Sequence, residues 1–333
     1  MTTSLTLRDR ILLVTLAAVQ FVHVLDSLIV IPLAPELMRD MTLSTSQFGA
    51  LVSSYSLAAA FAGLLGAFLL DRFDRKRAML VLFVGLISGT LICGVSSSLT
   101  ILFLGRIVAG ACGGLIQALL FAIIGDCFKE TSRGTATGIV MSSFSVATVI
   151  GVPVSLYLVA HGTWRFPFLV LAGLGAVVAL IAGFTLPPLR GHLTFVAKTQ
   201  ALLKRSKLEG GLPPTSFSVF LFKRNTRFAF MLIISLMFAG FSVIPYMSAY
   251  LVSNLKLSHE DLATVFFAGG VATFATARLV GRFADRFGKR KVYTVLALCS
   301  AFPTLALTHM GPLPMVPLLF VTTIFTLLIA ARG

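Results

Sequence analysis

The chain has 333 residues, of which 57% are hydrophobic and 12% charged, and its mean hydropathy is +0.97. This composition excludes a soluble domain and predicts an all-α, polytopic membrane protein. The net charge of +15 would suggest a nucleic-acid partner in a soluble protein, but in membrane proteins basic residues gather on cytoplasmic loops, so we expect no nucleic acid. The four cysteines stand singly in apolar runs, so we expect no metal site, and we expect no cofactor.

Ten apolar segments are long enough, at about 20 residues each, to cross the hydrocarbon core of a bilayer. They lie near residues 11–34, 46–70, 78–96, 99–125, 134–160, 166–187, 228–252, 261–282, 291–309 and 312–331. Arg8 and Arg10 before the first segment resemble the start of a signal peptide. No small-residue cleavage site follows, so we expect a retained first helix.

One long polar interval divides the segments into six and four. We therefore expect an N-terminal six-helix half at 1–188, a cytoplasmic basic linker at 189–227 and a partial C-terminal half of four helices at 228–333. Residues 196–208 of the linker fit a basic amphipathic helix that lies on anionic lipid, and partner binding is the alternative.

Lys and Arg are distributed unevenly between the loops on the two sides of the membrane. If the N-terminus is cytoplasmic, the outside loops hold only Arg39, Arg165 and Lys256, and Arg106 and Arg278 lie within spans. The other 22 of the 27 basic residues are then cytoplasmic. This asymmetry predicts a cytoplasmic N-terminus and a cytoplasmic linker.

An acidic residue, Asp26, interrupts the first span in the sequence F-V-H-V-L-D-S-L-I-V-I-P. A carboxylate in the membrane is costly, so Asp26 is a candidate proton carrier that needs a cationic partner. The alternative is an aspartate that only hydrogen-bonds a neighbouring helix. His23 lies one turn earlier and either shares the proton or makes a helix contact, and Gln20 lies a further turn inward on the same side.

Two short basic loops recur 214 residues apart. Residues 281–291 read G-R-F-A-D-R-F-G-K-R-K, and residues 67–77 read A-F-L-L-D-R-F-D-R-K-R. The second copy resembles the loop G-x-x-x-D-R-x-G-[RK]-[RK] of the major facilitator superfamily, and the first is a degenerate copy with Ala67 and Asp74 at glycine positions. The matching residues, for which the resemblance implies a gating role, are Asp71, Arg72, Arg75, Lys76, Gly281, Asp285, Arg286, Gly288, Lys289 and Arg290.

The resemblance implies a fold of two related six-helix halves, which is typical of secondary transporters. With six spans followed by four, we expect the last two of twelve helices to be missing, through truncation or in a natural ten-span variant. In this superfamily the eleventh helix closes the cavity and supplies a partner for the first loop's aspartate, so Asp71 would lack that partner.

The fourth span carries the expected cationic partner, Arg106, at a depth similar to that of Asp26. Its sequence G-R-I-V-A-G-A-C-G-G resembles the superfamily's fourth-helix motif R-x-x-x-G, which implies a role near proton transfer. Gly110, Gly113 and Gln117 follow Arg106 at helical spacing. The glycines allow another helix to approach closely, and Gln117 is a candidate for the substrate cavity.

The fifth span contains Gly138, Gly151 and Pro153, which resemble the glycine and proline motif of antiporters in this superfamily, although Val152 and Ser155 depart from it. The following H-G-T-W-R-F-P-F resembles the G-W-R-x-x-F of bacterial efflux permeases. Both features favour export over uptake.

The seventh span ends with Pro245, which can kink it, and with Tyr246 and Tyr250 on one helical face. These rings either line a substrate cavity or anchor the helix at the membrane interface. Tyr246 is the cavity candidate.

The sequence contains no nucleotide-binding, nucleophile or zinc-protease motif, so we expect no enzyme, and no channel filter is visible. It predicts a proton-coupled secondary transporter, multi-pass in the bacterial inner membrane, that exports small organic compounds by alternating access. A solute:proton symporter and a truncated, transport-inactive protein are the alternatives. The expected partners are a small-molecule substrate, protons and the lipid bilayer, and we expect a monomer.

Overall fold

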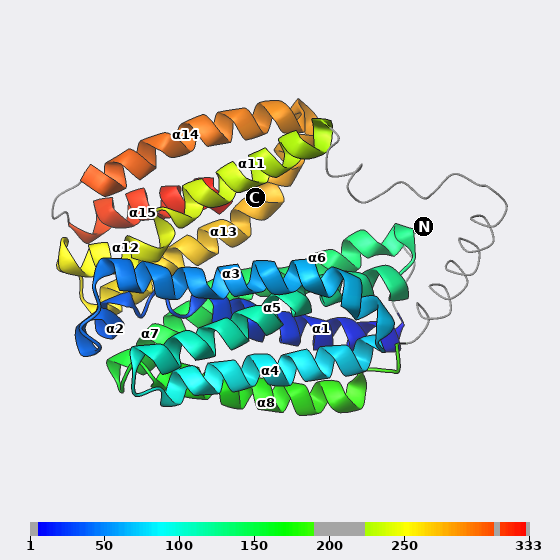
Figure 1. The fold of residues 1–333 in the computed structure, drawn as a ribbon. Coiled ribbons are helices and arrows are strands. Elements are labelled where there is room, and N and C mark those ends of the chain that lie inside the picture. The colour runs from blue at the N-terminus through cyan, green and yellow to red at the C-terminus, as the bar shows by residue number, and fades with distance from the viewer. Residues whose placement is uncertain (1–5, 190–223, 310–313, 331–333) are drawn as a thin grey trace.

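A computed structural model describes residues 6–189, 224–309 and 314–330 of the chain (Figure 1). These residues form helices, turns and short connections, without a strand among them. The N-terminal half contains α1 (Leu7–Leu28), α2 (Ala34–Asp40), α3 (Thr45–Leu69), η1 (Leu70–Arg72), α4 (Arg75–Val95), α5 (Leu99–Cys127), α6 (Glu130–Val146), the π-helix η2 (Ala147–Gly151), α7 (Val152–Ala160) and α8 (Phe166–Thr185). The C-terminal half contains α11 (Arg224–Phe241), α12 (Ile244–Ser253), α13 (His259–Phe287), α14 (Lys289–His309) and α15 (Met315–Ala330).

Seven helices in the described part of the chain are long and apolar enough to cross a membrane. They correspond to the first six predicted spans and to the ninth. The other three predicted spans are also helical: α13 is apolar over Asp261–Thr273, α15 has 16 residues, and the seventh span is divided between α11 and α12. Pro245 lies in the first turn of α12, where its missing amide hydrogen costs no helical bond.

The first predicted span is shorter than expected. We predicted a helix to residue 34, but α1 ends at Leu28 and a turn connects it to α2. Pro32 explains the difference, because proline has no amide hydrogen and disfavours helical geometry in the residue before it. Asp26 therefore lies in the last turn of α1, whereas a helix to residue 34 would have placed it about two turns from the helix end.

Polar residues fix where several helices begin. Thr6 and Asp9 form a capping box at the start of α1, and Ser44 and Gln47 form a second one at the start of α3. Ser98 accepts a hydrogen bond from the Ile101 amide and so caps α5. Each cap satisfies amide groups that would otherwise have no partner in the first turn.

The internal repeat predicted from the two basic loops is present in the helices. Helices α3 and α13 begin at Thr45 and His259, and helices α4 and α14 begin at Arg75 and Lys289. Both pairs are 214 residues apart. The two halves are therefore built on one helical plan over this region.

The two basic loops turn by different chemistry at equivalent positions. Asp74 caps α4 by accepting hydrogen bonds from the amides of Lys76, at 2.9 Å, and Arg77, at 3.4 Å. Gly288, its counterpart in the second half, has a φ of +88°, in the region that favours glycine. The first copy thus lacks the glycine of the pattern because its aspartate caps a helix instead.

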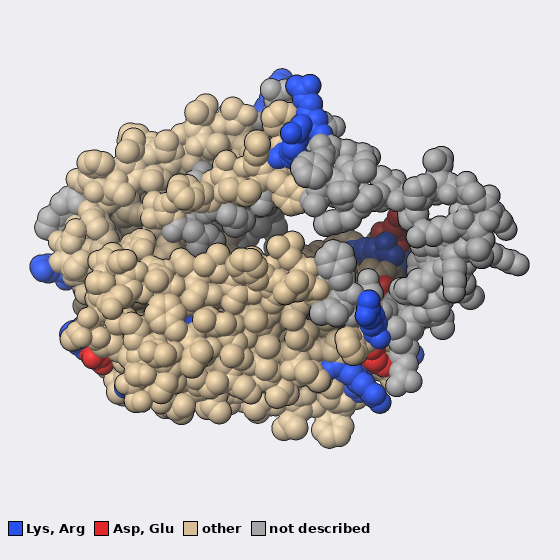
Figure 2. Space-filling model, in the orientation of Figure 1, with Lys and Arg blue, Asp and Glu red and all other residues tan. Residues whose placement is uncertain are grey.

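The two halves lie side by side, with α1–α8 below and α11–α15 above in Figure 1. We call the end with Thr6, Arg75 and Leu189 the linker end, and the opposite end, with α2 and α12, the α2 end. The halves contact each other where α2 meets α12 and where η2 and α7 meet α13. Figure 2 shows a hollow between the halves toward the linker end.

Basic residues gather at the linker end, where Figure 2 shows most of the visible blue side chains. Among the described residues, those near helix termini at this end include Arg8, Arg10, Arg72, Arg75, Lys76, Arg77, Lys129, Arg133, Arg224, Arg227 and Arg286. Arg39, Arg165 and Lys256 lie at the α2 end, as the charge pattern predicts. The predicted linker at 189–227, with its amphipathic segment, lies almost entirely outside the described residues.

Candidate functional site

Asp26 lies in a fully buried polar cluster between α1, α4 and α5. The Thr90 hydroxyl of α4 donates to its Oδ1 at 2.6 Å. The Nη1 atom of Arg106 lies 3.6 Å from its Oδ2, and the side chains of Asp26 and Arg106 are each 1% exposed. The structure thus brings the predicted acid and its predicted cationic partner together.

Arg106 also holds the end of α1. Its Nη1 atom donates a hydrogen bond of 2.9 Å to the main-chain carbonyl of Asp26. This carbonyl belongs to the last turn of α1, where carbonyl groups have no helical partner and carry the negative end of the helix dipole. The guanidinium group is therefore attracted by the end of α1 as well as by the carboxylate.

Tyr55 of α3 completes the cluster, and neither Tyr55 nor Thr90 was predicted from the sequence. Its ring lies against the Arg106 guanidinium at 4.2 Å, which is a cation–π contact. Tyr55 is 5% exposed and Thr90 is 1% exposed. Both are polar residues inside apolar spans, which indicates that each is buried against a polar neighbour. However, α3 and α4 contain several polar residues, and the sequence does not show which of them face Asp26 and Arg106.

Glycines of α5 let these groups meet. A methyl group on Gly113 would lie 2.6 Å from the Tyr55 hydroxyl and 3.0 Å from His23 Nε2. A methyl group on Gly110 would overlap the main-chain carbonyl of Tyr55. The glycines predicted to allow close approach therefore do so, with α3 and with α1.

The remaining polar residues predicted for this region also lie inside the N-terminal half. Gln20 donates a hydrogen bond to Gln117 at 3.0 Å, which joins α1 to α5. Gln20 is buried, and His23 is 9% exposed. Gln20, His23 and Asp26 follow each other at intervals of three residues, about one helical turn each.

The fifth predicted span contains the π-helix η2, which lies at the contact between the halves. Gly151 packs closely on α1, because a methyl group there would lie 2.7 Å from a Leu25 methyl carbon. Pro153 lies in the first turn of α7. Gly138 has open space around it and makes no close helix contact. π-Helical turns are frequent at functional sites, so this interruption is a candidate for a gate.

The first basic loop makes an ion pair at the linker end. Arg75 Nε lies 3.1 Å from Asp126 Oδ2 at the end of α5, and the Arg75 side chain is only 7% exposed. Arg72 is exposed and Lys76 is half-buried. The side chains of Asp71, Asp285, Lys289 and Arg290, and the surroundings of Gly281, lie outside the described part of the structure. Arg286 stacks on the neighbouring Phe287 at 5.4 Å.

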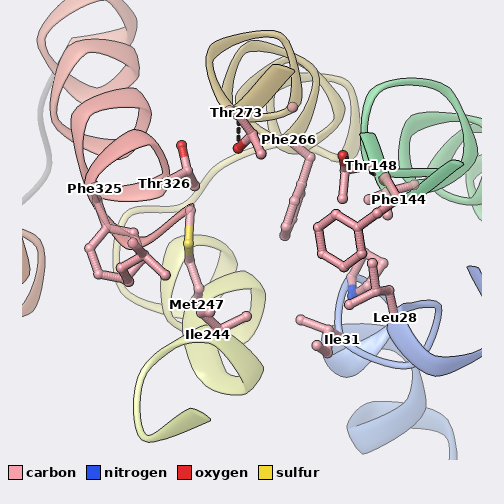
Figure 3. Close-up of a pocket in the computed structure, with 15 residues that line it drawn as sticks. Leu28, Ile31, Phe144, Thr148, Ile244, Met247, Phe266, Thr273, Phe325 and Thr326 are labelled. Carbon is pink, nitrogen blue, oxygen red and sulfur yellow. Dashed lines mark hydrogen bonds between the residues drawn. The ribbon is translucent and has the colours of Figure 1, made fainter. Parts of the chain in front are cut away.

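A central cavity of about 200 Å³ lies between the halves (Figure 3). Its walls come from the end of α1 and the following turn, α6, η2, α7, α12, α13 and α15. Among the residues that the structure describes, the lining is mainly apolar, with three threonine hydroxyls and no ionisable side chain: Leu28, Ile31, Pro32, Phe144, Thr148, Val152, Ile244, Met247, Phe266, Gly269, Gly270, Thr273, Phe325, Thr326 and Ile329. Such a cavity suits a small, uncharged and largely apolar molecule.

Tyr246 lies beside this cavity at the contact between the halves. Its ring packs edge-on against Phe48 of α3 with centroids 6.3 Å apart, and its hydroxyl contacts Gly49. Its helix neighbours Ile244 and Met247 line the cavity. Ser248 also donates a hydrogen bond to the Ile31 carbonyl, so α12 closes on the N-terminal half at the α2 end.

The described residues thus form a helical membrane protein of two halves around a cavity, with the buried Asp26–Arg106 pair in the N-terminal half. The sequence matches the Major Facilitator Superfamily over residues 16–331, and the chain belongs to this superfamily.

Two relatives agree with this family, and a solved structure shares the fold. The chain is 31% identical to the uncharacterized MFS-type transporter YhcA of Bacillus subtilis, over 52% of this chain and 32% of YhcA. It is 30% identical to azole resistance protein 1 of Saccharomyces cerevisiae, over 53% of this chain and 28% of that protein. The alignments therefore span about a third of each relative. The fold resembles the crystal structure of a D-xylose–proton symporter with a TM-score of 0.76 and 17% identity, over 97% of this chain and 80% of the other.

Proposed function

We propose that the chain is a proton-coupled secondary transporter that exports small organic compounds by alternating access. The observation that carries this proposal is the buried pair of Asp26 and Arg106, because a carboxylic acid beside a fixed cation inside a membrane protein is the kind of group that binds and releases protons. The pair lies in the half that contributes α1, α6 and α7 to the central cavity.

Protonation of Asp26 changes the forces between α1 and α5. With the carboxylate ionised, Arg106 is neutralised by it, and the two helices attract each other at this point. With the carboxylate protonated, the guanidinium keeps its hydrogen bond to the Asp26 carbonyl and its contact with Tyr55, but its charge is no longer balanced. A proton on Asp26 therefore changes the relative stability of conformations that differ in how α1 packs on α5. A ligand biases an equilibrium between two conformations in the same way.

The contacts between the halves support alternating access. Among the described residues these contacts lie toward the α2 end, and a hollow faces the linker end (Figure 2). The positive-inside rule puts the basic linker end in the cytoplasm, so we assign this structure to an inward-facing state of a protein in the bacterial inner membrane. The chain in our proposal acts as a monomer, because both halves of the cavity wall come from one chain.

Export is favoured over uptake by the sequence of the fifth span and by the uncharged cavity. Gly151 is the last residue of the π-helix that meets α13, and Pro153 follows it in the first turn of α7, where a bend would open or close the cavity. One relative bears the name azole resistance protein, which is compatible with removal of a lipophilic compound. A solute:proton symporter remains the second candidate, because the same acid–base pair would serve it equally.

Transport into proteoliposomes under an imposed pH gradient tests the proposal, with radiolabelled chloramphenicol as a neutral aromatic probe. Antiport predicts that the probe accumulates in vesicles with an acidic interior, whereas symport predicts accumulation in vesicles with an alkaline interior. Asp26→Asn should abolish accumulation, while Asp40→Asn, which removes only an exposed carboxylate paired with Arg39, should not. Gradient-driven accumulation by Asp26→Asn would refute the assignment of the proton carrier.

A further inference from the structure

Buried polar atoms without a hydrogen-bond partner are concentrated in one place. Among the described residues, five buried side-chain atoms in the cluster around Asp26 accept or donate no hydrogen bond within the protein, although one of them, Asp26 Oδ2, forms the ion pair with Arg106. These five are Gln20 Oε1, His23 Nδ1, Asp26 Oδ2, Tyr55 Oη and Arg106 Nε. Buried groups of this kind are costly unless ordered water meets them, so their concentration identifies a polar region that ordered water would stabilise.

The region has a direction along α1. Gln20 lies nearest to the linker end, His23 lies one turn further, and Asp26 lies one turn beyond His23. Gln20 is bonded to Gln117, which is half-buried and so lies at the edge of the buried cluster. The polar groups thus lead from the linker side inward to the carboxylate.

The central part of this route passes Gly113. The Tyr55 hydroxyl and His23 Nε2 both lie within 3.0 Å of the position that a Gly113 methyl group would occupy. Both groups therefore face one small space on α5 that only a glycine leaves open. A hydroxyl and an imidazole can each accept one proton and release another, so both are suited to proton transfer.

The polar region is separate from the central cavity. Leu28 is the residue of α1 that lines the cavity. It lies two residues after Asp26, so the two side chains point in directions roughly 200° apart around the helix axis. None of the five atoms belongs to a residue that lines the cavity. Helix α1 thus lies between the cavity and the carboxylate.

We propose that protons reach Asp26 through the interior of the N-terminal half, by way of His23 and Tyr55, and not through the substrate cavity. This rests on the proposed function, in which Asp26 carries the proton. In each transfer one nitrogen or oxygen gains a proton and releases another to the next group, and the last proton forms the O–H bond of the Asp26 carboxylic acid. His23 and Tyr55 end in the protonation state in which they began, so the only net change is at Asp26.

Other titratable and charged groups around this route are few among the described residues. Besides Arg106 and Tyr55, which belong to the cluster, the groups near it are Cys112 on α5 and Cys93 on α4. Helix α8, which also packs on α1, has no ionisable side chain in Phe166–Thr185. His23 is therefore the one imidazole beside Asp26 in this part of the structure.

Two variants interrupt the route without removing a charge. Tyr55→Phe keeps the ring that contacts Arg106 and removes only the hydroxyl. Gly113→Ala places a methyl group between the tips of Tyr55 and His23, and its closest contacts are with these side chains and not with main-chain atoms. Gly125→Ala is the matched control on the same helix, because nothing lies within 4 Å of the added methyl group.

The test compares two assays in proteoliposomes with labelled chloramphenicol. For Tyr55→Phe and Gly113→Ala we expect the initial rate of pH-gradient-driven accumulation to fall by at least about tenfold, since a positioned proton-transfer group contributes that much or more to a rate. Counterflow at equal pH, which needs no net proton movement, should stay at the wild-type rate, and Gly125→Ala should match the wild type in both assays.

Two outcomes would overturn the proposed route. Wild-type gradient-driven rates in both variants would show that the proton travels elsewhere, and a parallel loss of counterflow would show that the two residues serve structure or solute binding instead. Failure of the proposed function looks different, because the wild-type chain itself would then ignore the pH gradient, or Asp26→Asn would still respond to it.

Discussion

The close approach of α3 and α5 at Gly110 gives a stability prediction that depends on the tertiary structure alone. A methyl group at Gly110 would overlap the carbonyl oxygen of Tyr55 and lie 2.9 Å from both the carbonyl carbon and the Cα of the same residue. All three are main-chain atoms, which cannot rotate away as a side chain can. Gly110→Ala must therefore separate the two helices.

The size of the effect follows from two opposing contributions. Overpacking costs about 1–3 kcal/mol, and contacts with three main-chain atoms place this site near the upper value. Alanine gains about 1 kcal/mol over glycine in helix propensity. The expected net loss in the free energy of unfolding is therefore about 2 kcal/mol. Gly125→Ala makes no contact and should instead gain about 0.5–1 kcal/mol.

Unfolding of the purified variants in detergent micelles would measure this difference. The two alanine variants should differ by about 3 kcal/mol, or roughly a hundredfold in the unfolding equilibrium constant, with the wild type between them. Both changes add the same methyl group to the same helix, so propensity cancels in the comparison. Equal stability of the two variants would mean that α3 and α5 are not packed through Gly110.

Two further predictions concern the first basic loop and the central cavity. Asp74→Ala removes the cap of α4 and should lower the free energy of unfolding by about 0.5–2 kcal/mol. Asp74→Ser can still accept a hydrogen bond from the Lys76 amide and should retain most of the stability of the wild type. An equal loss of stability in both variants, measured by unfolding in micelles, would contradict the capping role. Thr273→Val removes a hydroxyl from the cavity wall at nearly constant side-chain shape and should change the KM of solute counterflow. The dependence of transport on the pH gradient should stay unaltered, because the cavity and the Asp26 cluster lie on different faces of α1. A changed pH dependence in Thr273→Val would argue against separate routes for proton and solute.

The sequence predicted the helical membrane fold because the requirement for about 20 apolar residues per span is local and leaves a clear hydropathy pattern. The 214-residue repeat was visible for a related reason, since a basic turn between two apolar helices can be recognised without knowing what the helices contact. The pairing of Asp26 with Arg106 could be predicted from depth, because two opposite charges in an apolar medium have few other partners.

The tertiary structure decided what surrounds that pair. Tyr55 and Thr90 are uncharged, so nothing in the sequence of α3 or α4 shows which of their polar residues faces α1. That choice depends on how the helices are rotated against each other, and Gly110 and Gly113 set how closely α5 approaches α3 and α1. The apolar lining of the central cavity likewise comes from helices in both halves. The sequence by itself determined the approximate spans and the buried charges, because both depend on the composition along one helix. It also predicted which loops are cytoplasmic, because that depends on the Lys and Arg content of each loop. Which faces meet, and hence the separation of the Asp26 cluster from the cavity, depended on packing between helices.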